Sequence, residues 1–409
     1  MSAAPRPAAA GDAVLGVAPR LVFEPAAEEE AAEAMRACAR DGLRVAFVGG
    51  GTDLGLGNAP SALDAVIRTS GMSRVLEHAP QDQIVRVEAG ITLSALQARL
   101  APHGQRLALD PPFPDRATAG GILCGNAFGP LRASRGSARD LVIGASFVRA
   151  DGAVARGGGK VVKNVAGFDL PRLLFGSFGT LGLVTAVNFR LHPLPETSAT
   201  LLLPGLTPAQ VRQATREILS AQVEPAATAA LVRGERLDLA VRFEGFGPGV
   251  SGQADRLLAA ARRASLGGEI LAAEPAADFW AGCGAARERG PFRARLSVPP
   301  AGLERAHAAL ATLLRALPGG AGVWYPTLGL GFVGGAPAAP AELASAAGDA
   351  RGALAALGGS LLVNDAPPEV RARLDAWGPA PSALPLMRRL KAQLDPEGRL
   401  APGRFAGGI

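Results

Sequence analysis

The sequence contains few cysteine, histidine or aromatic residues, and each scarcity excludes a class of protein. Its three cysteines are widely spaced, which excludes a disulfide framework and a CxxC metal or redox motif. Aromatic residues make up only 5% of the chain and do not alternate with clustered basic residues, as they do in many nucleic-acid binders. No run of about 18 apolar residues could span a membrane, and the N-terminus has no apolar signal-peptide core. We therefore expect a protein of the reducing cytoplasm.

Small residues dominate what is present, including 53 glycines and 33 prolines. A hydrophobic content of 48% excludes global disorder, and a length of 409 residues predicts two to three domains. The formal net charge is +6, but the arginines are spread through amphipathic segments such as 211–217 and 254–263. We interpret this basicity as ordinary surface charge and expect no nucleic-acid partner.

Periodicity and turn residues predict a mixed order of elements before residue 196. Residues 1–20 are expected to be a flexible arm, and the Gly- and Pro-rich region 108–139 is expected to be a long functional loop. The predicted helices are 24–41 and 92–104, and the predicted strands are 43–50, 64–70, 83–90, 140–152 and 181–195. Two prolines after the last strand mark a domain boundary near residue 196.

The second half also alternates helical and strand patterns, which predicts an α+β fold for the chain. The predicted helices are 207–220, 252–265, 302–316 and 341–357, and the predicted strands are 237–245, 293–299 and 323–335. The expected domains are 21–195, 196–384 and a C-terminal helix and turn, 385–409, that returns to the first domain.

The stretch GGGTD, residues 49–53, directly follows a predicted strand. Successive backbone N–H groups in such a turn form a concave anion site, and glycine lets a phosphate approach closely. A Rossmann loop fits poorly, because Leu54 stands where the third glycine belongs and no helix follows. GGGK, residues 157–160, fails as a P-loop. Val154 stands where the first glycine of that motif belongs, and Val161 follows the lysine in place of serine or threonine.

Two further glycine-rich regions follow, at 110–144 and 160–185. The second includes GSFGTLG, with glycines at 176, 179 and 182 and Phe178 between the first two. Several glycine-rich loops in a β-rich chain suggest one extended ligand that is contacted from several sides. A dinucleotide bound in a stretched form is such a ligand.

The order of these motifs resembles the vanillyl-alcohol-oxidase/PCMH (VAO/PCMH) family of FAD-dependent oxidoreductases. The matching stretches are GGGTD, TAGG…GNAFG…RGSARDLVIG and KNVAGFDLPRLLFGSFGTLG, which together span about residues 20–195. The tail LDPEGRLAPGRF is similar to the C-terminal turn of the family's 2-hydroxy-acid branch. The resemblance implies a PCMH-type FAD-binding domain of two α/β subdomains, followed by an α+β cap-like domain.

The resemblance also implies which residues contact FAD. In the family the first loop wraps the pyrophosphate, the second block lines the ribityl chain and flavin, and the third adds main-chain contacts. The implied residues are Gly49, Gly50, Gly51, Thr52, Asp53, Pro111, Thr118, Gly120, Gly121, Gly125, Asn126, Gly129, Arg135, Gly136, Ser137, Gly182, Leu183 and Val184. Lys163, Asn164 and Asp169 belong to the third motif, where Asn164 and Asp169 either serve the site or only cap a turn.

Many relatives attach FAD covalently through a histidine in the first loop. This loop has Thr52 and Asp53 instead, so the resemblance implies non-covalent FAD. Cys124 lies in the second block but does not match the family's cysteine-linkage motif, and we interpret it as a small buried thiol.

The family's catalytic branch carries a histidine-rich metal site in its C-terminal half and usually reads GSEGTLG. Here only His307 lies beyond the predicted boundary, and Phe178 replaces that glutamate. In both respects the chain resembles the accessory, E-type FAD subunit of bacterial glycolate oxidase. The partners implied are a catalytic FAD subunit and an iron–sulfur subunit, since three cysteines cannot hold a four-cysteine cluster.

Two alternatives remain open. In the first, the chain is a free-standing FAD-dependent 2-hydroxy-acid dehydrogenase, with arginines near Trp280 that grip a carboxylate. Those arginines are Arg287, Arg289, Arg293 and Arg295, for which a solvated basic stretch is the favoured interpretation. In the second, it is a non-catalytic scaffold with a flavin fold. The sequence assigns no catalytic residue and no metal site, and any membrane contact is expected only through partners.

Overall fold

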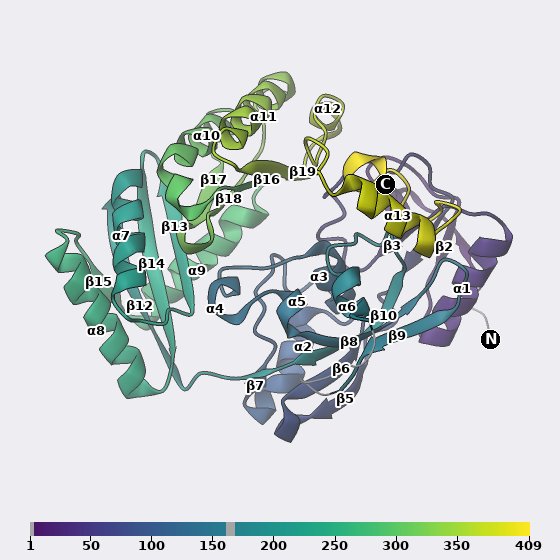
Figure 1. Cartoon of the computed structure of the whole chain (residues 1–409), viewed down its shortest axis with the longest axis horizontal. Coiled ribbons are helices and arrows are strands. Elements are labelled where there is room, and N and C mark those ends of the chain that lie inside the picture. The colour runs from purple at the N-terminus through teal and green to yellow at the C-terminus, as the bar shows by residue number, and fades with distance from the viewer. Residues whose placement is uncertain (1–3, 161–167) are drawn as a thin grey trace. The chain divides into compact units, whose positions relative to one another are not determined.

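A computed structural model describes residues 4–160 and 168–409 (Figure 1). Lys163 and Asn164 lie outside these described residues. The chain divides into two compact units: Met1–Gly129, Gly136–Leu194 and Pro379–Ile409 form the first, and Pro130–Arg135 with Pro195–Gly378 form the second. The mixed helix and sheet architecture that the sequence predicts is confirmed.

The first unit begins with a four-stranded sheet. Its strand order is β1 (Arg6–Pro7), β2 (Leu21–Phe23), β4 (Ala65–Arg68) and β3 (Val45–Val48), and β2, β4 and β3 run parallel. Helix α1 (Glu28–Arg40) buries a stripe that includes Met35 and Cys38 in the core of this sheet. Its acidic first turn complements the helix dipole. Strand β3 leads directly into GGGTD, so a buried strand holds the start of that loop.

The first unit also contains a second, antiparallel sheet of five strands. Its order is β5 (Val75–Ala79), β6 (Ile84–Glu88), β10 (Leu183–Arg190), β8 (Val142–Val148) and β9 (Val154–Gly158). Helices α2 (Leu93–Leu100), α3 (Ala119–Gly125) and α6 (Leu170–Leu174) contribute apolar residues to one core with this sheet. The short strands β7 (Gln105–Arg106) and β11 (His192–Pro193) pair separately.

The expectation of a long loop over 108–139 is wrong. This region contains α3, α4 (Arg132–Arg135) and α5 (Ala138–Leu141). Thr118 caps α3 by accepting a hydrogen bond from the Gly121 N–H, and Ile122 and Leu123 are buried in the core. The glycines that lower helix propensity are tolerated here because tertiary packing outweighs it.

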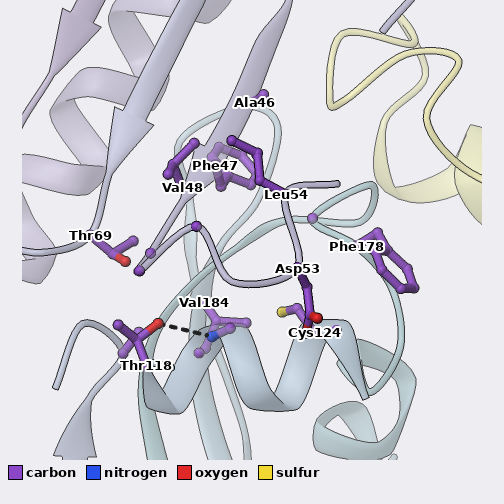
Figure 2. A pocket seen from close by; sticks show the side chains of 18 of the residues that line it. Ala46, Phe47, Val48, Asp53, Leu54, Thr69, Thr118, Cys124, Phe178 and Val184 are labelled. Atoms are coloured by element: carbon purple, nitrogen blue, oxygen red, sulfur yellow. Dashed lines mark hydrogen bonds between the residues drawn. The ribbon is translucent and has the colours of Figure 1, made fainter. Parts of the chain in front are cut away.

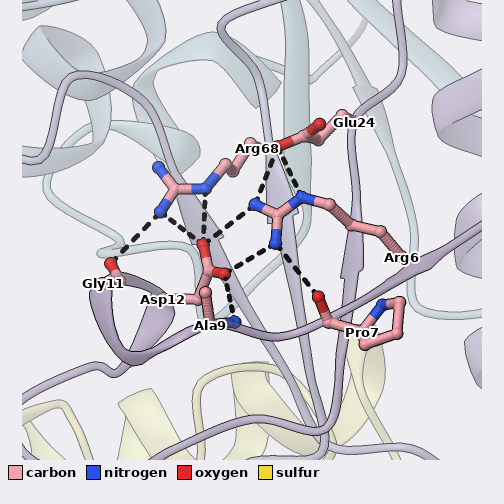
Figure 3. A network of polar contacts seen from close by, with 7 residues as sticks. All are labelled: Arg6, Pro7, Ala9, Gly11, Asp12, Glu24 and Arg68. Carbon is pink, nitrogen blue, oxygen red and sulfur yellow. Dashed lines mark hydrogen bonds and ion pairs between the residues drawn. The ribbon is translucent and has the colours of Figure 1, made fainter.

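The expectation of a flexible N-terminal arm is also wrong for the described residues 4–20. Strand β1 pairs with β2, and Val14 is fully buried. Asp12 receives Arg6 at 2.8 Å and Arg68 at 2.7 Å, and Figure 3 shows both guanidinium groups around its carboxylate. The hydrogen bond from Arg6 is the main cause that holds the pKa of Asp12 well below its usual range. This ion-pair network orders a segment whose composition suggested disorder.

The second unit is built on an eight-stranded antiparallel sheet. Its order is β15 (Glu269–Leu271), β12 (Thr197–Leu206), β14 (Arg236–Gly245), β13 (Ala227–Arg233), β17 (Ala321–Tyr325), β18 (Leu330–Gly335), β16 (Phe292–Ser297) and β19 (Ser360–Asp365). Apolar residues of α7 (Pro208–Ser220), α8 (Gly247–Arg263), α10 (Leu303–Arg315) and α11 (Pro340–Ala355) form its main core with the sheet. This unit also contains α4, α9 (Ala273–Glu288) and α12 (Pro368–Arg371).

The single strand expected over 323–335 is a hairpin. The turn Pro326–Leu328 separates β17 from β18, and Gly329 follows it with a φ of +64°. Proline cannot continue the ladder and glycine adopts the left-handed conformation, so the chain reverses here.

The C-terminal tail belongs to the first unit. Helix α13 (Leu384–Leu394) is followed by a turn and by an extended segment beside β3. The Val45 N–H donates to the Arg399 carbonyl at 2.8 Å, and the Ala401 N–H donates to the Val45 carbonyl at 2.7 Å. Within the described ranges, no helix combines the length and apolarity needed to cross a membrane.

Candidate cofactor-binding site

The first unit contains an open pocket with about 820 Å³ of empty space, part of it open to solvent (Figure 2). All three glycine-rich regions and the C-terminal tail contribute to its wall. The described lining residues are Ala46–Leu54, Thr69, Ala89, Thr118, Gly120, Gly121, Cys124, Gly125, Phe178, Gly179, Gly182, Leu183, Val184, Ala401 and Arg404. Segments up to about 350 residues apart therefore meet at one pocket.

Most of the predicted site residues come together around this pocket. Those that line it are Gly49, Gly50, Gly51, Thr52, Asp53, Thr118, Gly120, Gly121, Gly125, Gly182, Leu183 and Val184. The residues outside its lining are Pro111, Asn126, Gly129, Arg135, Gly136 and Ser137. Contact with FAD remains a prediction for both groups.

The predicted residues outside the lining have structural contacts of their own. Asn126 ends α3 with a φ of +53°, and a Cβ at Gly129 would lie 2.1 Å from the Asp110 carbonyl oxygen. Ser137 caps α5, and its hydroxyl donates to Asp140 at 2.9 Å. Arg135 lies in the segment 130–135, which belongs to the second unit.

The loop 49–53 requires glycine because neighbouring backbone approaches it closely. A Cβ at Gly50 would lie 1.7 Å from the Arg116 carbonyl oxygen, and one at Gly49 would lie 2.3 Å from the Thr118 hydroxyl oxygen. Gly51 has a φ of +71°. The loop is therefore a main-chain cradle whose first two glycines pack too closely on residues 116–118 to carry side chains.

Helix α3 forms the floor of the pocket beneath this loop (Figure 2). Its first N–H groups are already bonded, since Ala119 donates to the Ile91 carbonyl and Gly120 donates to the Ala89 carbonyl. The Gly121 N–H donates to the Thr118 hydroxyl. The N-terminus of this helix therefore caps itself and packs on β6, instead of presenting these donors to a phosphate.

The GSFGTLG segment closes the other end of α3. The N–H groups of Gly176 and Phe178 donate to the carbonyls of Leu123 and Cys124, which end the helix, at 3.0 and 3.1 Å. Gly176, Phe178 and Gly179 all have positive φ, at +68°, +53° and +73°. The regular glycine spacing therefore serves a tight turn that caps α3 and then enters β10.

Phe178 lies at the pocket wall in the left-handed conformation, which is unusual for a bulky residue. Its ring packs against Phe405 with the centroids 5.7 Å apart. The aromatic side chain thus connects the third glycine-rich region to the C-terminal tail.

Cys124 lies in the wall beside this turn, and Figure 2 shows it above α3. Burial raises the pKa of its thiol to about 11, so the thiol is protonated at neutral pH. Burial likewise raises the pKa of Cys38 and Cys283 to about 12. These thiols are therefore poor nucleophiles at neutral pH.

Sequence reasoning missed the contribution of the tail, above all Arg404. This arginine lines the pocket, is 5% exposed, and donates to the carbonyls of Leu54 and Leu56 at 2.9 and 2.7 Å. The only sequence signal for this contribution was the similarity of LDPEGRLAPGRF to the family's C-terminal turn. That similarity identified the motif but did not indicate that Arg404 lines the pocket.

Asp395 of that motif has a structural role in the tail. Its carboxylate accepts the Leu400 N–H at 2.7 Å and pairs with Lys391 at 2.6 Å. The Lys391 ammonium also donates to the Thr180 carbonyl at 2.8 Å. Burial lowers the pKa of Lys391, while Asp395 opposes that shift. The motif therefore ties the tail to the GSFGTLG segment.

Among the described residues, no group of three or more His, Cys, Asp or Glu side chains could hold a metal ion. His307 is buried beside Trp324, whose indole N–H donates to its Nδ1 at 3.3 Å. Burial lowers the pKa of His307, which keeps the imidazole neutral at physiological pH.

The arginines suggested as a carboxylate clamp make contacts within the second unit. Arg293 pairs with Asp365 at 2.8 Å, Arg289 donates to the Gly319 carbonyl, and Arg287 stacks on Phe332 at 4.4 Å. The ring of Trp280 instead makes a cation–π contact with Arg242, whose guanidinium carbon lies 4.2 Å from the ring centroid. The cluster near Trp280 is thus partly engaged in the fold of this unit.

Comparison with known proteins identifies a recognised type of domain within the first unit. Residues 19–158 match the family described as FAD binding domain. The chain is 33% identical over 207 residues to glycolate oxidase subunit GlcE of Escherichia coli (strain K12), which covers 50% of this chain and 54% of that protein. It is 34% identical over 209 residues to glycolate oxidase subunit GlcD of Bacillus subtilis (strain 168), which covers 51% and 44%.

A further relative is a D-lactate dehydrogenase of Archaeoglobus fulgidus, 33% identical over 195 residues, with 46% of this chain and 43% of that protein covered. The chain spans about half the length of the curated relatives it matches. Among solved structures, alkyldihydroxyacetonephosphate synthase matches 95% of this chain and 78% of its own with a TM-score of 0.70 and 18% identity. This likeness establishes the shared fold.

Proposed function

Because residues 19–158 form a FAD-binding domain of the VAO/PCMH type, we propose that this chain is the accessory FAD subunit of a complex that oxidises glycolate to glyoxylate. FAD is the cofactor of this domain. The proposed partners are a catalytic FAD subunit and an iron–sulfur subunit, with any membrane contact made through them. The similarity to GlcE supports this assignment.

The pocket fits a stretched dinucleotide. Gly49, Gly50 and Gly51 line the pocket without side chains, and Gly51 adopts a positive φ, so we expect their N–H groups to be open to the close approach of a pyrophosphate. Gly120 and Gly125 on α3 continue this side-chain-free surface. The lining also includes apolar residues such as Val48 and Val184, which suit the rings.

A non-covalent complex is the form we propose. The described residues that line the pocket include no histidine, and the Cys124 thiol is held protonated by burial. When bound, FAD supplies the capacity to accept two electrons and pass them on. The role of this chain is to hold and orient it and to exclude water from its buried parts.

The observation that carries the accessory role is the pocket's shortage of acid–base groups. Among the described lining residues, the side chains with ionisable groups are Asp53, Cys124 and Arg404. Phe178 stands where the catalytic branch of the family usually carries glutamate, and the described residues hold no metal cluster. Oxidation of a 2-hydroxy acid requires a base for the hydroxyl proton and a cation for the carboxylate. We place those groups on the catalytic partner.

The test is anaerobic reduction of the purified protein, followed at the flavin absorbance near 450 nm. The chain alone should be yellow and should keep its colour with glycolate or D-lactate. The complex with both partners should bleach with glycolate, and bleaching of both flavins would make this FAD an electron relay.

Other outcomes would replace the proposal. Bleaching of the isolated chain by either hydroxy acid would make it a free-standing dehydrogenase. A folded but colourless chain that supports activity of the complex would make it a scaffold.

A further inference from the structure

The C-terminal segment 399–405 completes the wall of the FAD pocket, and we propose that Arg404 is a positioning residue for FAD that supplies positive charge toward the pyrophosphate. This inference rests on the FAD cofactor and not on the proposed glycolate chemistry. It therefore stands or falls separately from the accessory-subunit assignment.

Hydrogen bonds fix the Arg404 side chain to the end of the first glycine-rich loop. Its Nη2 donates to the carbonyls of Leu54 and Leu56, and its own carbonyl accepts the Asn58 N–H at 3.0 Å. These contacts directly follow the cradle 49–53 in sequence. A guanidinium held this way is placed beside the loop at low cost in side-chain entropy when a ligand binds.

Arg404 differs from the other described lining residues in its positive charge. Among the described residues that line the pocket it is the basic one, and Asp53 is the acidic one. The pyrophosphate of FAD carries two negative charges, and the cradle 49–53 offers N–H dipoles and the Thr52 hydroxyl but no positive charge against them. Moving such a group out of water is unfavourable unless charge or hydrogen bonds compensate. The buried guanidinium of Arg404 provides that compensation.

The backbone of the tail is held by contacts that do not involve the Arg404 side chain. The Val45 N–H and carbonyl bond to Arg399 and Ala401, and the Ser61 N–H donates to the Pro402 carbonyl at 2.9 Å. Substitution of Arg404 should therefore leave the tail in place. This separates an effect of the guanidinium on FAD from a general loss of the tail.

The experiment compares R404Q and R404K with R399Q as the matched control. Arg399 is 6% exposed, lies in the same segment and donates to the Ala150 carbonyl at 2.8 Å, but it does not line the pocket. The dissociation constant for FAD is measured by titration of each apo protein with flavin fluorescence as the readout. The thermal midpoint of each apo protein reports stability.

R404Q should weaken FAD binding about tenfold to a hundredfold, the range expected when a hydrogen bond to a charged group is lost. R404K keeps the charge but not the guanidinium that Leu54 and Leu56 hold, so it should lose clearly less affinity than R404Q, under about tenfold. R399Q should stay within about threefold of the wild type, even if it melts earlier. FAD binding should also weaken with salt in the wild type and less so in R404Q.

The proposal is overturned if R404Q binds FAD within about threefold of the wild type, or if R399Q loses as much affinity as R404Q. Equal losses in R404K and R404Q would remove the role of charge. If R404Q does not fold, R404K decides the matter, since a loss of more than about tenfold in this charge-preserving variant contradicts the proposal.

Discussion

Phe178 shows how a single residue can combine strain with a defined place in a site. Its backbone lies in the left-handed region, which costs a bulky L-residue about 1 kcal/mol or more. It is nevertheless held there, because its N–H caps α3 and its ring packs against Phe405. Gly176 and Gly179 in the same turn also have positive φ, but glycine adopts it without strain. A strained phenylalanine at the pocket wall therefore indicates that its side chain has a role beyond forming the turn.

The strain at Phe178 predicts an order of stability for two variants. F178A removes the ring but keeps a Cβ in the left-handed conformation, whereas F178G removes both. We expect F178G to be more stable than F178A by about 1 kcal/mol in urea unfolding of the apo protein. Equal stability of the two variants would mean that the turn relaxes and that the strain is not retained.

At the scale of elements, the starts of three strands are joined by one carboxylate. Asp64, just before β4, accepts the Arg44 N–H at 3.0 Å and its Nε at 2.6 Å, and Arg20 before β2 approaches at 3.4 Å. The side-chain hydrogen bond from Arg44 is the main cause that lowers the pKa of Asp64 to about 2. The carboxylate therefore aligns the parallel strands from which the pocket loop leaves.

The shifted pKa of Asp64 predicts a pH-dependent effect of D64N. The ordinary pKa of an aspartate is about 3.9, so the folded state holds its proton less tightly than the unfolded chain. The stabilisation is therefore complete above about pH 4 and is lost as the pH falls toward about 2. D64N should be less stable than the wild type at pH 7, and the gap should narrow in urea unfolding at pH 3. A gap that is unchanged between the two pH values would contradict this linkage.

Helix α11 offers a stability test away from the site. Gly348 is exposed in the helix, and a Cβ there would meet no atom within 4 Å. G348A should stabilise the protein by about 1 kcal/mol, because alanine has the higher helix propensity. Denaturant unfolding measures this effect, and the affinity for FAD should not change. A loss of stability would show that the helix surface is not open at this position.

How well each element could be predicted depended on how local its signal is. Helices α7 and α10 follow the expected ranges 207–220 and 302–316 closely, since amphipathic periodicity lies within the element itself. Helix α3 was missed because its glycines lower helix propensity, and the packing and C-terminal capping that stabilise it come from distant parts of the chain. The N-terminal segment was missed because the Asp12–Arg68 pair joins residues that are distant in sequence.

The same distinction applies to the site. The glycine-rich segments could be recognised because close approach and positive φ leave a local mark in the sequence. The position of Arg404 could not be predicted, since its partners Leu54 and Leu56 lie 350 and 348 residues earlier in the chain. The individual FAD contacts remain predictions for the residues that line the pocket and for those that do not.

On the scale of the whole molecule, each unit has its own hydrophobic core. The proposed FAD pocket is lined by residues of the first unit, so we expect FAD to stabilise that unit selectively. With free FAD at a hundred times its dissociation constant, the expected gain is about 2.7 kcal/mol. Calorimetry should show two unfolding transitions, with FAD raising the midpoint of only one. A single transition that shifts as a whole would mean that the units unfold cooperatively.

The position of segment 399–405 beside β3 has a consequence for biosynthesis. Ala401 and Arg404 leave the ribosome about 350 residues after the strand and loop that they complete. At roughly 5–20 residues per second, this delay is on the order of tens of seconds. During that interval the nascent chain lacks two residues of the pocket wall, so we expect cofactor loading to follow translation. An interrupted product that ends before this segment would not carry the complete pocket wall.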